Sequence, residues 1–121
     1  SSNSGVEIVS IEPTDQQGNP VTEFTKNKIG FVKVVLSADN PINSLVTVNL
    51  FDSELTSLGV GSFKTQLSGE HEIILSFFTP EFATIGDGEI YANVFSEWPS
   101  VGGIPLTGES SSKVILKWIS N

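Results

Sequence analysis

The feature of this chain that most constrains its fold is a series of short apolar runs separated by turn residues. The runs are rich in Val, Ile, Phe and Thr and cover residues 6–12, 29–38, 44–51, 62–67, 71–78, 89–97 and 112–119. Turn residues such as Asp39-Asn40-Pro41 and Asp87-Gly88 lie between them. No stretch keeps a 3.6-residue apolar period over the length of a typical helix. The pattern predicts an all-β chain, a two-sheet antiparallel sandwich of about seven to nine strands, with at most one helical turn at 79–86.

Alternation within the runs predicts which side chains fill the space between the sheets. Every second residue of a strand points to the same face, so the apolar positions of period two should face inward. The predicted core residues are Val46, Val48, Leu50, Ile73, Leu75, Phe77, Ile90, Ala92, Val94, Val114, Leu116 and Trp118. Lys113 and Lys117 then fall on the solvent face of the last strand.

Several outward positions are apolar as well, which is unusual for an antiparallel sandwich with a solvated outer face. Two interpretations remain open: loops cover some of these positions at strand ends, or they form a surface that meets another protein. The first run adds apolar side chains on both of its faces. The candidate subunit-interface residues are Val6, Ile8, Val9, Ile11, Phe51, Tyr91, Phe95 and Ile115.

The segment 98–107 interrupts the strand pattern before the last run and is too long for a tight hairpin. It combines Trp98 with Pro99, Pro105 and the pair Gly102-Gly103. Loops at the ends of sandwiches often carry binding functions, so Trp98, Pro99 and Pro105 are candidate recognition residues. The alternative, which the usual burial of large aromatic residues favours, is that Trp98 folds back and caps the core.

Charge and composition exclude several classes of function. The chain has 14 acidic residues and six lysines, no arginine, and a formal net charge of −8, which argues against a nucleic-acid partner. Cysteine is absent, so disulfides, thiolate nucleophiles and cysteine-based metal sites are excluded. No run is long and apolar enough to predict a membrane span.

The first residues and the absence of methionine bear on localisation. The chain begins with the small, polar stretch SSNSG, as a mature chain does after removal of a signal peptide. We therefore expect an extracellular or cell-surface protein; the alternative is a fragment excised from a longer chain.

Residues with catalytic potential are sparse. His71 is the only histidine and lies between Glu70 and Glu72, as a solvated surface residue would. Three carboxylate pairs occur, at 52/54, 70/72 and 87/89, but none has the spacing of a calcium loop. We predict no enzymatic activity, no cofactor and no metal site, with weak calcium binding at these pairs left open.

Turn and core residues spread over nearly the whole chain carry a family resemblance. Asp15, Gly18, Asn19, Pro20 and Val21 form a D-x-x-G-N-P-V turn after the first strand, and "LSGEHEIILSFFTP" and "IYANVFSEWPSVGGIPLT" follow later. The sequence resembles immunoglobulin-like modules of the CARDB kind in archaeal secreted and cell-surface proteins. That resemblance implies a single immunoglobulin-like domain over 1–121 and a non-enzymatic role in surface layers, adhesion or extracellular filaments.

Two functional hypotheses follow. In the first, the protein is a subunit of an archaeal surface filament with a role in adhesion, and its main partner is itself. It polymerises by donating a terminal strand, with 1–12 as the donor and 13–20 as the linker, because sheet edges accept added strands. In the second, it is a secreted module that binds a glycan or a cell-surface protein through the 98–107 loop.

Overall fold

The computed structural model describes residues 5–118, which form six β-strands and one short 3-10 helix. The strands are β1 (Val6–Thr14), β2 (Glu23–Thr25), β3 (Ile29–Phe51), β4 (Ser57–Phe78), β5 (Gly86–Phe95) and β6 (Ser110–Lys117), and the helix is η1 (Pro99–Val101).

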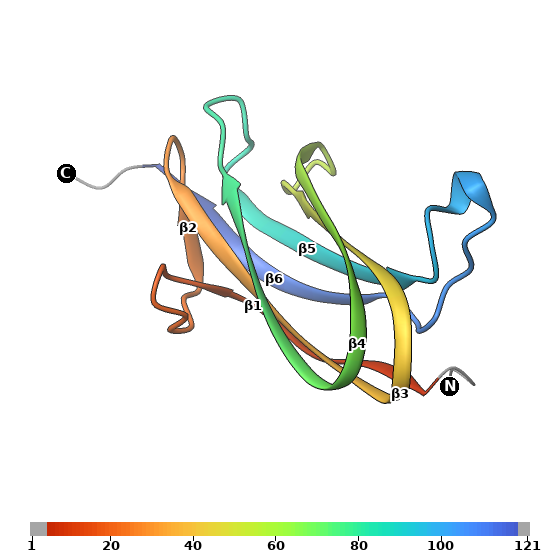
Figure 1. The fold of residues 1–121 in the computed structure, drawn as a ribbon. Helices are drawn as coiled ribbons and strands as arrows, with labels where there is room; N and C mark the ends of the chain where they lie inside the picture. Colours follow the sequence, from red (N-terminus) through yellow and green to blue (C-terminus); the bar gives the residue numbers. More distant parts are fainter. Residues whose placement is uncertain (1–4, 119–121) are drawn as a thin grey trace.

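Two very long strands dominate the fold. β3 and β4 pair antiparallel along almost their full length, from Ile29 opposite Phe78 to Phe51 opposite Ser57. Both strands bend in the middle, where the register shifts between Ala38 and Ile42 (Figure 1). Each strand therefore runs through one layer of the sandwich and continues into the other.

The remaining strands complete the two layers. In the first layer β1 pairs antiparallel with residues 31–38 of β3. In the second layer β5 pairs with residues 45–51 of β3, and β6 and then β2 follow it. The β2–β6 pair is parallel and the others are antiparallel. β4 forms one edge of both layers, and β1 forms the other edge of the first.

The all-β immunoglobulin-like sandwich is thus confirmed, with fewer and longer strands than the sequence pattern indicates. The turn-type residues at 39–41 and 67–70 lie where the strands bend, and the ladder continues past them. The helical turn that the sequence allows at 79–86 is absent. Residues 79–85 form a non-helical connection, and β5 begins at Gly86.

Alternation predicted the core well. Of the predicted residues, Val46, Val48, Leu50, Phe77, Ile90, Ala92, Val94, Val114 and Leu116 are buried, while Ile73 and Leu75 are half-buried against them. Trp118 is a correction: it is 53% exposed, and its ring packs over the Nζ atom of Lys26 at 3.9 Å. β6 ends at Lys117, so the alternation no longer holds at the next residue.

Two glycines allow the β4 edge of the sandwich to close tightly. A Cβ atom on Gly61 would lie 3.3 Å from Cδ1 of Leu75, and one on Gly59 would lie 3.2 Å from Cδ1 of Phe77. Leu75 and Phe77 belong to the other half of the same strand, so β4 folds back on itself and the side chains of Leu75 and Phe77 pack directly on the backbone of Gly61 and Gly59.

Candidate subunit interface and binding loop

β1 is an edge strand whose only strand partner in the described chain is β3. Its register changes between Ile8, opposite Leu36, and Ser10, opposite Val35, so Val9 is the extra residue of a β-bulge. The bulge returns Ile11 to the inner side of the strand, because one inserted residue reverses the alternation that follows it.

The predicted interface residues of β1 are therefore not equivalent. Val6 is buried, and Ile8 and Ile11 are half-buried against the core. Val9 alone points outward, at 49% exposure. Apolar side chains thus lie on both faces of β1 as expected, but the outer face carries Val9 alone, and the inner side chains pack against the core of the same domain.

The turn after β1 is held by one carboxylate. Oδ1 of Asp15 accepts hydrogen bonds from the backbone N–H groups of Gln17 and Asn19, both at 2.9 Å, and Gly18 has a φ of 88°. These hydrogen bonds keep the pKa of Asp15 below its ordinary value, and the bond from the Asn19 N–H has the largest effect. The predicted turn is thus present, but β1 continues to Thr14, so the connection begins at residue 15.

The other candidate interface residues lie on the outer face of the second layer. Phe51 and Tyr91 pack edge to face, with ring centroids 5.7 Å apart at 79°. Burial, followed by the negative charge of Glu89, raises the pKa of Tyr91. Phe51, Tyr91 and Phe95 are half-buried and Ile115 is exposed, so side-chain packing already occupies much of this face.

Leu45 is buried, although its neighbour Val46 faces the core and the alternation would therefore direct Leu45 to the outer face. It lies between Lys64 and Phe95 in the strand ladder, and an ion pair of 2.8 Å joins Lys64 to Glu97.

The segment between β5 and β6 forms an ordered loop. Its base is a pair of hydrogen bonds: the Ser96 N–H donates to the Ile104 carbonyl, and the Ile104 N–H donates to Oγ of Ser96. The N–H groups of Val101 and Gly103 both donate to the carbonyl of Trp98.

Glu97 lies at the start of this loop. The hydrogen bond from Lys64, and after it the one from the Trp98 N–H, hold the pKa of Glu97 below its ordinary value. Trp98 is 41% exposed, and Pro99 and Pro105 are exposed, so the loop presents its tryptophan to solvent.

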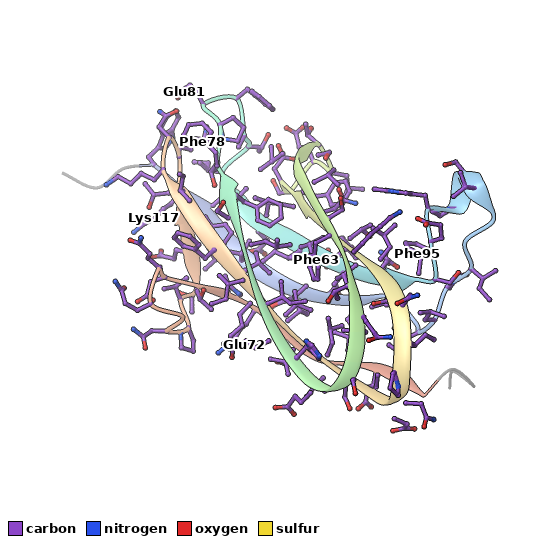
Figure 2. All side chains as sticks on the ribbon, in the orientation of Figure 1. Phe63, Glu72, Phe78, Glu81, Phe95 and Lys117 are labelled. Carbon is purple, nitrogen blue, oxygen red and sulfur yellow. The ribbon has the colours of Figure 1, made fainter. Side chains whose placement is uncertain are left out.

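A group of apolar side chains lies at the opposite end of the molecule, and of its members the strand alternation indicates only Phe78 as an outward residue. Ile29, Phe78 and Phe82 are 61%, 52% and 69% exposed, and the exposed Trp118 completes the group, which we call the apolar end. Ile29 and Phe78 face each other across the β3–β4 ladder. Figure 2 shows Phe78 and Glu81 together at this end, far from Phe95. The double aromatic Phe77-Phe78 was the available signal, because in a strand one of two neighbouring residues must point outward.

A buried lysine organises the apolar end. Lys26 is buried, donates a hydrogen bond of 2.9 Å to the carbonyl of Glu81, and lies under the ring of Trp118. Nδ2 of Asn27 donates to Oε1 of Glu81 at 2.7 Å, and the Asn27 N–H donates to the Thr79 carbonyl. The turn before β3 and the connection after β4 are therefore fixed against each other.

One member of the carboxylate pairs has a structural role. Asp52 is buried; its Oδ1 accepts from the N–H groups of Glu54 and Thr56, and its Oδ2 accepts from that of Thr84. Within residues 5–118 no group of three or more His, Cys, Asp or Glu side chains could hold a metal ion. The same residues include no helix long and apolar enough to cross a membrane.

Comparison with known proteins identifies the fold of the chain. No protein-family model and no curated protein sequence matches the chain. Among solved structures it is similar to the C-terminal domain of Wzt, with a TM-score of 0.71 and 12% identity over 100% of this chain and 77% of that one. It is also similar to the CARDB domain of the PF1109 protein from Pyrococcus furiosus, solved in complex with di-metal ions, with a TM-score of 0.58 and 12% identity over 98% of this chain and 100% of that one. The resemblance to a CARDB-type module is confirmed at the level of fold, which is compatible with a non-enzymatic binding or structural module.

Proposed function

We propose that the protein is an extracellular filament subunit that polymerises by donating β1 to a neighbouring copy, with a role in cell adhesion. The observation that carries this proposal is the position of β1: an edge strand with one strand partner, whose inner side chains fill a groove beside β3. In exchange, the β1 of the next copy occupies that groove and makes the same contacts, so each acceptor recovers the burial that it loses.

The composition supports a surface location. A chain with no cysteine and a net charge of −8 stays soluble and needs no control of its redox state outside the cell. The connection at 15–22 supports exchange because its local hydrogen bonds centre on one carboxylate, Asp15, and Val21 is the one residue of this connection that packs against the core, where it is only half-buried.

A disulfide that locks β1 in its own groove tests the proposal without removing the strand. Glu7 lies directly opposite Ser37, at a spacing that a disulfide can bridge, and the chain has no other cysteine. The variant Glu7→Cys/Ser37→Cys, oxidised as a monomer, is expected to remain monomeric and to form filaments after reduction. Filaments formed equally well in both states would overturn strand donation.

Deletion of residues 1–12 gives an independent test. The shortened chain keeps an acceptor groove and lacks a donor strand, so added in small amounts it should end growing filaments and shorten them in electron micrographs. The control is the full-length chain with Val60→Ser, a change of an exposed side chain far from β1. Added in the same small amount, it should not shorten the filaments.

The second candidate function is that of a secreted module that binds a glycan or a protein through the loop after β5. The observation in its favour is the ordered, exposed Trp98 beside a hollow of about 330 Å³ lined by Asn43, Ser44, Lys64, Thr65, Gln66, Ser96 and Glu97. Trp98→Ala is expected to abolish adhesion to cells without changing assembly if this loop is the binding site. If the Trp98→Ala variant assembles and adheres to cells as the wild type does, this loop is not the binding site.

A further inference from the structure

The direction of β1 determines where a donating neighbour must lie. Thr14, the last residue of β1, lies opposite Phe31, whereas Val6 lies opposite Ala38. A strand bound in this groove therefore leaves it toward Ile29, at the apolar end of the acceptor (Figure 1). The eight residues 15–22 that lead to the body of the donor span at most about 27 Å when fully extended.

We propose that the apolar end, formed by Ile29, Phe78, Phe82 and Trp118, is a docking surface for the body of a second copy of this chain. This inference rests on the proposed strand donation and adds a second contact to it. Four large apolar side chains gathered in one place lose solvent contact on docking, which stabilises the assembled form.

The apolar end is fixed in position before any partner arrives. Buried Lys26 joins the Glu81 carbonyl to the Trp118 ring, and Asn27 binds the side chain of Glu81. The Thr79 N–H also donates to the Lys28 carbonyl at 3.1 Å. Because these bonds already order the two segments, docking costs little conformational entropy.

The direction of β1 points to a second copy as the occupant, because a donated strand brings the body of its own chain to this end of the acceptor. The charges of this end are nearly balanced: Lys26 is buried, Lys117 pairs with Glu23 at 3.0 Å, and Glu54 and Glu81 offset the remaining lysine, Lys28. The rest of the chain carries eleven acidic residues and three lysines. A nearly neutral apolar end can therefore meet the acidic body of a second copy without charge repulsion.

Placing a negative charge in the apolar end tests the inference. Phe82→Glu and Phe78→Glu are expected to raise the concentration at which half of the protein is assembled by at least about tenfold, because each removes an apolar contact and adds repulsion. Val60→Glu is the matched control: Val60 is 64% exposed on the same strand as Phe78 and lies outside this end. Sedimentation velocity over a concentration series measures the effect, and thermal melting checks that each variant is folded.

Each outcome decides between the two proposals. If Val60→Glu weakens assembly as much as Phe82→Glu, or if Phe82→Glu and the milder Phe82→Ser both assemble as the wild type does, docking at the apolar end is wrong. If only the locked-strand variant loses assembly, strand donation stands and this inference falls. If the apolar-end variants lose assembly while the locked strand does not, the apolar end is an interface without strand donation. A wild-type chain that stays monomeric at high concentration overturns both.

Discussion

At the scale of single residues, Asp52 shows how a carboxylate can organise a fold without a metal. Its two oxygen atoms accept three backbone N–H groups, from Glu54, Thr56 and Thr84, and so join the turn after β3 to the connection before β5. The sequence contains the pair 52/54 but does not reveal whether its oxygens face solvent or buried N–H groups. That information comes from residue 84, which is distant in sequence.

Replacing Asp52 with alanine should destabilise the protein. The change leaves the N–H groups of Glu54, Thr56 and Thr84 without their acceptor in a partly buried setting, which costs roughly 1–2 kcal/mol of the free energy of unfolding. Urea denaturation followed by tryptophan fluorescence measures the loss. Asp87→Ala, at an exposed position, is the control and should have little effect; an equal loss for both would show that the N–H bonds to Asp52 are unimportant.

The same carboxylates predict how stability depends on pH. Burial raises the pKa of Asp52, but the bonds from Thr84, Thr56 and Glu54 together outweigh it, so the net pKa lies below the ordinary 3.8. The pKa values of Asp15 and Glu97 are also lowered. When the folded pKa is the lower one, the unfolded state binds more protons as pH falls, so the stabilisation is present above the unfolded pKa and is lost on passing through the folded one.

The free energy of unfolding should therefore be nearly constant above about pH 5 and fall steeply below about pH 4. Urea titrations at several pH values test this, and Asp52→Ala should show a shallower fall. A free energy that rises on acidification would contradict the assignment.

At the scale of elements, the bent β3–β4 pair depends on the absence of side chains at two positions. Gly61→Val should destabilise the fold by roughly 1–3 kcal/mol through overpacking, although valine otherwise favours strands. Its Cβ would lie 3.3 Å from Leu75 and 3.5 Å from Phe77. Gly108→Val is the control, since no atom lies within 4 Å of a Cβ at that position. Equal melting temperatures for Gly61→Val and the wild type would show that the two halves of β4 pack loosely.

Alternation predicted nine of the eighteen buried residues of the core cluster, because one face of each run meets the other sheet. It did not predict the continuity of the long strands, since Asn40-Pro41 and Gly69 are ordinary turn residues and only the pairing across the hairpin shows that the ladder continues. The bulge at Val9 was hidden for a similar reason: its register is set by Val35 and Leu36 of the partner strand. Leu45 and Trp118 both have partners that are distant in the sequence: Leu45 lies between Lys64 and Phe95 in the ladder, and Trp118 packs over Lys26.

At the scale of the whole molecule, the proposed exchange sets the direction of assembly. Each copy would accept a strand beside β3 and donate its own β1, and the apolar end would receive the body of the donor. An interface between two different surfaces gives an open chain of copies unless the rotation that relates neighbouring copies closes a ring. The expected product is therefore a filament. A reciprocal exchange of β1 between two copies would give a closed dimer instead.

The most direct measurement of strand donation uses two single-cysteine variants. Glu7→Cys and Ser37→Cys, mixed in equal amounts, unfolded together, refolded into assemblies and then oxidised, place the two thiols opposite each other only when β1 of one chain lies beside β3 of another. We predict a covalent heterodimer on a non-reducing gel, formed in assembled material and absent from the monomer fraction. Assemblies that contain no such crosslink, while the double variant Glu7→Cys/Ser37→Cys closes its disulfide within single chains, would contradict strand donation.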